Sequence, residues 1–304
     1  MSDFLTQPSA TREPLEAAFG DTGNPLALDG IEFIEYVTPR PQALGQVLEM
    51  MGFRPIARHR SREVMLYRQG ALNVVVNAHA QNNQSGQDRP VIAALALRVR
   101  DARAAYAYAL ERGAWEVSTK VEAMELNIPA IHGAGGSRIY FVDRYKEFSI
   151  YDVDFSPIPG VDLHPPATAG IHFFGVVQYI GSDRSNDWIE FYQELFGAVV
   201  ISPDQRFGIM PRGTLIHFPA LDPANRFMFQ LIEPEVTVLD HHEHLQRIGL
   251  GVPDVFTAVE TLRANGIDFV ETQAAHTESR GAITKTYDRG LVFELVHSPQ
   301  APSA

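Results

Sequence analysis

The stretch GIEFI at residues 30–34 returns later in the chain as GIHFF at residues 170–174. Each copy is followed by a segment whose apolar residues recur at helical spacing, and each segment closes on a glycine, Gly52 in the first half and Gly197 in the second. A glycine just after a helix supplies the left-handed backbone conformation that ends many helices. We therefore expect two related halves, each opening with a strand and a helix.

A second repeat lies inside each half. The segments LALRVRD at 95–101 and IGLGVPD at 248–254 alternate like strands and run into an aspartate, a favoured helix N-cap. Four strand–helix–strand modules, two in each half, account for this pattern. The β-rich stretches that complete the sheets are Val64–Asn77, Ser137–Phe155, Thr214–Glu233 and Thr284–His297.

The repeats also predict the domain organisation. We expect an N-terminal arm at 1–27, a first domain at 28–158, a linker rich in proline at 159–167, a second domain at 168–298 and a tail at 299–304. The predicted fold class is α+β, with tandem βαβββ modules that form curved, partly open sheets and carry their helices outside.

Composition excludes several classes of function. Lys and Arg number 25 against 37 Asp and Glu, so the net charge of −12 disfavours nucleic acid and membrane surfaces as partners. The absence of cysteine excludes disulfides, thiolate metal sites and a cysteine nucleophile. No basic and apolar leader opens the sequence and no apolar run of about 18 residues occurs, which predicts a cytoplasmic protein.

The first half resembles the bacterial 4-hydroxyphenylpyruvate dioxygenases, a family of the vicinal oxygen chelate superfamily. The resemblance covers most of residues 28–160 and thins after about residue 170, where mainly the modular pattern remains. The stretches that carry it are Gly30–Val37, Met51–Phe53, His59–Ser61, Leu66–Gly70, Met124–Ile131, Gly135–Ser137, Ile139–Tyr145 and Ile150–Phe155.

This resemblance implies a site in the second half. In the family the first half is a scaffold, and the second holds Fe(II) through two His and one Glu, leaving positions open for a 2-oxo acid and dioxygen. The first and third ligand positions fall on His172 and Glu294. The second falls on Arg247, seven residues before Asp254, where the family has His. A guanidinium stays protonated and has no lone pair, so Arg247 cannot bind a metal.

Two interpretations of the second half follow. In the first, a local shift lets His244 or His242, from the run DHHEH at 240–244, replace the missing imidazole. In the second, Arg247 pairs with Glu294 or binds a carboxylate ligand, and the pocket works without a metal. The segment FMFQLI at 227–232 is expected to line the pocket through Phe227, Phe229 and Gln230, whose amide can orient a ligand carbonyl.

The sequence thus predicts a divergent member of the family that acts on a small 2-oxo acid or aromatic acid. Arg247 and Gln230 are its predicted catalytic residues, and His172, Glu294 and His244 its predicted metal ligands. The metal is Fe(II) or another divalent ion that is weakly bound, altered or absent. The alternatives are a lyase related to the 3-dehydroshikimate dehydratases or a metal-free binding protein, and a homo-oligomer is compatible with each.

Overall fold

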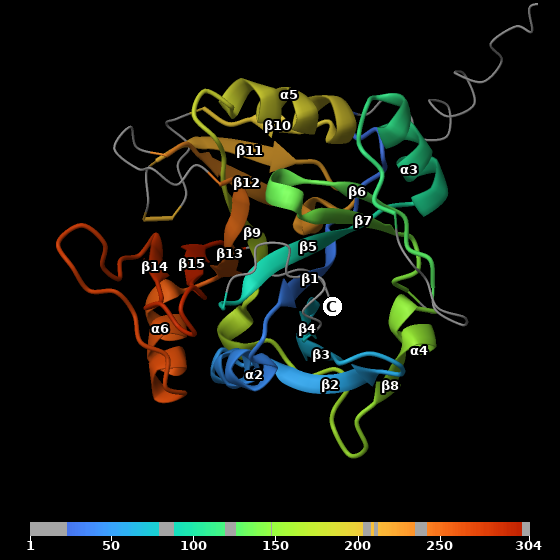
Figure 1. The fold of residues 1–304 in the computed structure, drawn as a ribbon. Helices are drawn as coiled ribbons and strands as arrows, with labels where there is room; N and C mark the ends of the chain where they lie inside the picture. Colours follow the sequence, from blue (N-terminus) through green and yellow to red (C-terminus); the bar gives the residue numbers. More distant parts are fainter. Residues whose placement is uncertain are drawn as a thin grey trace, which may run out of the picture.

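The computed structural model describes residues 23–78, 88–118, 126–146, 148–202, 208–209, 212–234 and 242–299. Its strands form two separate mixed sheets, one from each half of the chain (Figure 1). The first sheet has the order β6-β7-β5-β1-β4-β3-β2-β8, and the second has the order β10-β11-β12-β9-β13-β15-β14. Both are open sheets, which confirms the predicted fold class. The two sheets fall within the predicted domains, whose exact boundaries stay a prediction.

The elements have the following bounds. The strands of the first sheet are β1 (Ile31–Val37), β2 (Arg54–His59), β3 (Val64–Gln69), β4 (Leu72–Asn77), β5 (Val91–Arg98), β6 (Ala130–His132), β7 (Arg138–Val142) and β8 (Phe155–Pro157). Those of the second are β9 (His172–Tyr179), β10 (Val199–Val200), β11 (Thr214–Phe218), β12 (Phe227–Ile232), β13 (His244–Val252), β14 (Gly281–Ile283) and β15 (Phe293–His297). The α-helices are α2 (Pro41–Met50), α3 (Ala102–Glu111), α4 (Ile150–Asp154), α5 (Ser185–Phe196) and α6 (Val255–Ala264).

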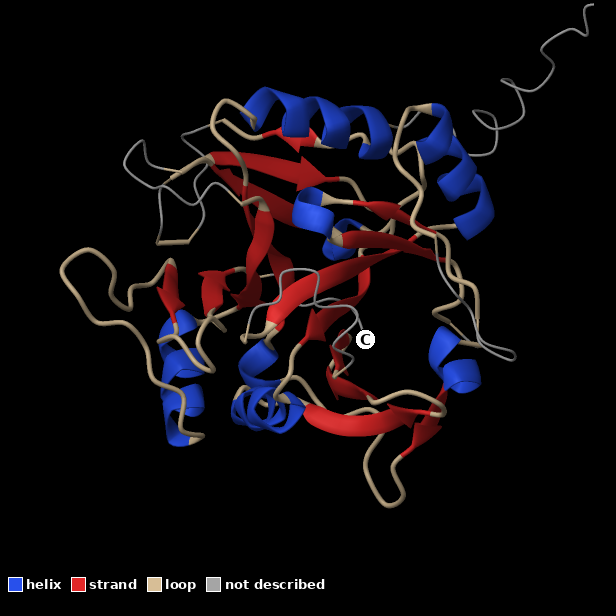
Figure 2. Cartoon of the chain, viewed as in Figure 1, coloured by secondary structure: helices blue, strands red, loops and turns tan. Residues whose placement is uncertain are grey.

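Strand pairing repeats between the halves as the sequence repeat predicts. At the centre of each sheet the first strands of two modules pair antiparallel, β1 with β5 and β9 with β13. Each of these strands pairs in parallel with a later strand of its own module: β1 with β4, β5 with β7, β9 with β12 and β13 with β15. The helices lie mainly around the outside of the strands (Figure 2).

Local capping explains where the helices begin and end. The Asp101 side chain accepts a hydrogen bond from the backbone N–H of Ala104 at 2.9 Å, and Asp254 accepts one from Thr257 at 2.6 Å. Gly197 ends α5 with a φ of 67°, the left-handed conformation that glycine adopts without strain. These predicted caps are confirmed.

One stretch predicted to be β-rich is partly helical. Within Ser137–Phe155, the residues Ile150–Asp154 form the short helix α4. The cause is local, because Asp152 accepts hydrogen bonds from the backbone N–H and the hydroxyl of Ser149, at 2.8 and 3.0 Å, in a capping box. The prediction of a strand there was wrong.

Two hydrophobic clusters form the core. The larger runs through both halves and packs the outer helices against the sheets, with Tyr192 of α5 fully buried at its centre. The smaller lies within the first half and includes Phe33, Leu66, Val75 and Tyr151. Among the described residues, no helix is long and apolar enough to span a membrane.

Candidate functional site

The centre of the second sheet joins Arg247 of β13 to Glu294 of β15. The Nε of Arg247 donates to Glu294 Oε2 at 2.8 Å, and Nη1 donates to the side-chain oxygen of Gln246, also at 2.8 Å. Each member of the Arg247–Glu294 pair is only 4% exposed. A buried carboxylate needs a balancing charge, and here the guanidinium supplies it.

One nitrogen of Arg247, Nη2, has no well-aligned hydrogen-bond acceptor. This nitrogen lies 2.7 Å from the same carboxylate oxygen, but it is buried and no acceptor in the described structure is aligned with its N–H bonds. Its charge is therefore balanced by Glu294, whereas its N–H bonds are left without a well-aligned acceptor. An oxygen atom of a ligand that reached this nitrogen would supply that acceptor.

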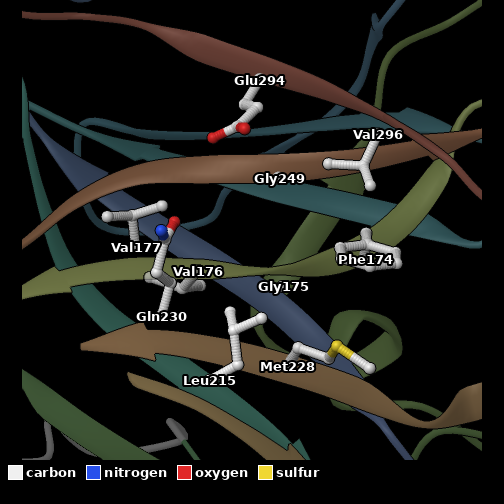
Figure 3. Close-up of a pocket in the computed structure, with 10 residues that line it drawn as sticks. All are labelled: Phe174, Gly175, Val176, Val177, Leu215, Met228, Gln230, Gly249, Glu294 and Val296. Atoms are coloured by element: carbon white, nitrogen blue, oxygen red, sulfur yellow. The ribbon is translucent and has the colours of Figure 1, made fainter. Parts of the chain in front are cut away.

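A small pocket lies beside Glu294, on the face of the second sheet that carries this side chain (Figure 3). Figure 3 shows the Glu294 carboxylate and the Gln230 amide on opposite sides of the space left by Gly175 and Gly249, which have no side chains. The pocket has a volume of about 30 Å³, which is room for about one or two water molecules. Its remaining lining is apolar: Phe174, Val176, Val177, Leu215, Met228 and Val296.

Strand β12 contributes different side chains from those predicted. Met228 and Gln230 line the pocket, whereas Phe227 and Phe229 belong to the larger hydrophobic core on the other face. The Phe227 ring stacks on Phe218 with centroids 4.6 Å apart. Successive side chains of a strand point to opposite faces, so Gln230 and the two phenylalanines cannot share one. The prediction that Phe227 and Phe229 line the pocket was wrong. Strand alternation is the signal in the sequence that identifies Met228 as a lining residue beside Gln230.

Gln230 is held at the rim of the pocket. Its amide nitrogen donates to the backbone carbonyl of Arg212 at 2.5 Å. The register places Gln230 beside Val177 of β9, and Val177 in turn lies opposite Arg247. Gln230 and Arg247 thus lie in one cross-strand row, with strand β9 between them.

His172 is buried and fully hydrogen bonded. Its Nδ1 lies 3.0 Å from the carbonyl of Gly170, which can only accept, so Nδ1 carries the proton. Its Nε2 lies 3.0 Å from the hydroxyl of Ser298 and accepts from it. Burial lowers the pKa of His172, against a smaller opposing effect of the Gly170 carbonyl, and so favours the neutral ring. Its ring occupies the space over Gly251, where a Cβ would come within 2.3 Å of Nε2.

His244, the first residue of β13, lies away from the Arg247–Glu294 pair. His244 lies opposite Tyr179 in the register, with ring centroids 5.3 Å apart, while Arg247 lies opposite Val177. The Nδ1 of His244 bonds to the carbonyl of His242 at 2.8 Å. Asp240 and His241, the first two residues of the run DHHEH, lie outside the described residues.

The residues present do not fit the Fe(II) site that the resemblance implies. No group of three or more His, Asp or Glu side chains in the described part of the chain could hold a metal ion. The Glu294 carboxylate is paired with the guanidinium of Arg247, and the lone pair of His172 Nε2 accepts a hydrogen bond from Ser298. The structure therefore does not bring His172, Glu294 and His244 together as a ligand set.

Sequence reasoning also missed Gly208. A Cβ on this residue would lie 2.5 Å from Glu294 Oε1, and its φ is +68°. The backbone of Gly208 thus packs directly against the carboxylate on the side away from Arg247 Nε. The preceding segment offers no periodicity that would bring it to the site, so this contact was not predictable from the sequence pattern.

Comparisons with known proteins agree with this fold, and the family model that matches covers the first half. The family model "Hydroxyphenylpyruvate dioxygenase, HPPD, N-terminal" matches residues 22–156. The 4-hydroxyphenylpyruvate dioxygenase of Pseudomonas aeruginosa is 32% identical over 270 residues, which is 84% of this chain and 75% of that protein. The chain belongs to the 4-hydroxyphenylpyruvate dioxygenase family. It is thereby a member of the vicinal oxygen chelate superfamily.

Other similar proteins differ in how much of their length this chain spans. The 4-hydroxyphenylpyruvate dioxygenase of Pseudomonas sp. strain P.J. 874 is 42% identical over 178 residues, which is 57% of this chain but only 50% of that protein. A variant of 4-hydroxymandelate synthase from Streptomyces coelicolor has a similar fold, with a TM-score of 0.68 and 19% identity over 91% of this chain and 95% of that one. At this identity the structural likeness establishes the fold alone.

Proposed function

We propose that this member of the 4-hydroxyphenylpyruvate dioxygenase family binds a small aromatic or 2-oxo acid without a metal ion, at the Arg247–Glu294 pair. The observation that carries the proposal is the buried ion pair itself, with Arg247 standing where the family resemblance places an imidazole. Arginine does not deprotonate in proteins, so the pair has no net charge to attract a metal cation.

The chemistry of the pair favours an oxygen acceptor on the ligand. Arg247 Nη2 is the buried donor without an aligned acceptor, and it lies next to the carboxylate that lines the pocket. Because Glu294 already balances the guanidinium, a neutral carbonyl oxygen is a better partner there than a second carboxylate. A 2-oxo acid supplies that carbonyl, and its carboxylate can then lie farther from Glu294.

The apolar lining favours an aromatic or aliphatic body on the ligand. Phe174, Leu215 and Met228 surround the space, so a ring that enters buries apolar surface and excludes water from the pair. At about 30 Å³ the pocket is too small for a ring unless a side chain moves. Met228 is the side chain best able to move, because it is unbranched and has three rotatable bonds.

Calorimetry with 4-hydroxyphenylpyruvate tests the proposal. Protein purified without a His tag should contain no stoichiometric iron, manganese or cobalt, and a chelator should leave the measured Kd unchanged. Arg247→Met should weaken binding at least about tenfold, the loss of one hydrogen bond to a charged group. The matched control is Arg184→Met, which removes a surface guanidinium paired with Asp187 and should not change the Kd.

An oxygen-electrode assay supplies the opposing result. With 4-hydroxyphenylpyruvate, Fe(II) and ascorbate, we expect no oxygen uptake above background by the wild-type chain. Turnover by the wild type, or stoichiometric metal that a chelator removes together with binding, would overturn the proposal. Turnover by Arg247→His alone would support a wild-type site without a metal, and it would also show that the Ser298 hydroxyl does not keep His172 from binding one.

A further inference from the structure

A larger cavity lies in the first half, on the face that corresponds to the candidate site in the second. Its volume is about 150 Å³, against about 30 Å³ beside Glu294. Tyr140 pairs with Ala96 as Glu294 pairs with Gly249, and Glu35 lies opposite Ala94 as Val177 lies opposite Arg247. The cavity of the first half therefore corresponds in position to the pocket of the second half, but different side chains line it.

A buried carboxylate provides the charged group of this cavity. Glu35 is 6% exposed, and its Oε1 accepts a hydrogen bond from the amide of Asn77 at 2.8 Å. Burial raises the pKa of Glu35, while the Asn77 hydrogen bond and the charges of Arg138 and Arg62 oppose the rise. A cationic donor on a ligand would stabilise the ionised form, which the protein alone stabilises incompletely.

Aromatic rings form the walls. Phe33 packs on Tyr140 with ring centroids 5.9 Å apart, and Phe155 contacts Tyr151 at 5.7 Å and His59 at 5.2 Å. The short helix α4, which carries Tyr151, lies across from β1 and β4 (Figure 1). Aromatic faces attract both aromatic ligands and cations, and a cavity of about 150 Å³ is large enough for a benzene ring.

We propose that this cavity binds a small aromatic amine, with its ammonium group on Glu35 and its ring among Phe33, Tyr140 and Phe155. Arg62 and Asp154 also line the cavity. The shared chemistry is thus a phenyl ring with a protonated amine, and it has two sources, a simple amine or an amino acid. This site is separate from the Arg247–Glu294 pair and does not depend on the function proposed for it.

Calorimetry on the full chain with phenethylamine tests the assignment. We expect one binding site, and a loss of affinity of at least about tenfold in Glu35→Gln, which removes a charge-assisted hydrogen bond. The control Glu49→Gln makes the same chemical change at an exposed position of α2 and should leave the Kd within about twofold. No binding by the wild type, or equal affinity of wild type and Glu35→Gln, would overturn the proposal.

Further ligands and variants separate the remaining possibilities. Phenylalanine binding more tightly than phenethylamine would identify the amino acid as the source, and the reverse order the simple amine. The acid 3-phenylpropionate should show no dependence on Glu35, and dependence of the same size would contradict the role of the ammonium group. A second variant, Val64→Phe, tests the location without changing any charge, and it replaces Glu35→Gln if that variant does not fold. The larger side chain fills part of the cavity and should abolish amine binding. Retained binding would refute the location.

Discussion

Removing the guanidinium of Arg247 should destabilise the protein far more than removing a surface charge. Arg247→Met keeps an unbranched apolar side chain but leaves the Glu294 carboxyl, which is 4% exposed, without its balancing charge and without its Nε donor at 2.8 Å. Breaking one partner out of a buried ion pair costs about 3–5 kcal/mol. We expect a loss of about 3–5 kcal/mol in the free energy of unfolding.

The double variant separates the ion pair from simple packing. Replacing both partners with apolar side chains, as in Arg247→Met with Glu294→Leu, should recover most of the loss, because no charge is then left buried. Urea unfolding followed by circular dichroism and by tryptophan fluorescence measures both free energies, and coincident transitions establish that two-state values are meaningful. A loss below about 1 kcal/mol in Arg247→Met, or a double variant less stable than either single one, would refute the reasoning.

Three further predictions concern the same face of the second sheet. Since burial lowers the pKa of His172 below its ordinary 6.5, the unfolded state binds the proton first. Stability should therefore fall as pH drops below about 6.5, by at most about 1.4 kcal/mol per pH unit, and unfolding of His172→Gln should show a smaller slope; equal slopes would contradict this. Gly251→Ala places a Cβ 2.3 Å from His172 Nε2 and should cost about 1–3 kcal/mol, whereas Gly249→Ala meets its first atom at 3.6 Å and should cost less; thermal melts that rank them in reverse would be inconsistent with the packing. Met228→Ala enlarges the pocket and should tighten binding of 4-hydroxyphenylpyruvate in calorimetry, and an unchanged Kd would show that the ring lies elsewhere.

The parts of the fold that were predictable depend on short-range chemistry. Asp101 and Asp254 cap their helices through hydrogen bonds to residues three positions on, and Gly197 adopts a left-handed conformation that its missing Cβ permits. A glycine with positive φ follows the helix of every module, and the aspartate recurs in one module of each half, so the repeat predicted the architecture. The strand predicted at Ile150–Asp154 was wrong because its apolar residues suit either structure, and the nearby Ser149–Asp152 capping box decides for the helix.

The candidate site was less predictable because it depends on which side chains meet across strands. Arg247 and Glu294 could be placed in one site from the resemblance, and their pairing was one of two open interpretations. The hydrogen bond between His172 and Ser298 depends on the start of β9 lying near the end of β15, which no local pattern encodes. The apolar character of Phe227 and Phe229 is compatible with a pocket lining, but strand alternation places both rings in the hydrophobic core, on the face opposite Gln230.

The exchange at residue 247 changes the electrostatics of the whole face. A carboxylate with two neutral imidazoles carries one negative charge and requires a cation, whereas the Arg247–Glu294 pair is neutral and needs none. Restoring histidine at 247 recreates the charge but does not by itself free His172, whose Nε2 lone pair is held by the Ser298 hydroxyl at 3.0 Å. Two contacts therefore stand between this chain and the metal chemistry that its family resemblance implies. The substitution is best understood as part of a rearranged site, in which Arg247 and Ser298 already satisfy the Glu294 carboxylate and the His172 Nε2 that a metal would otherwise have used.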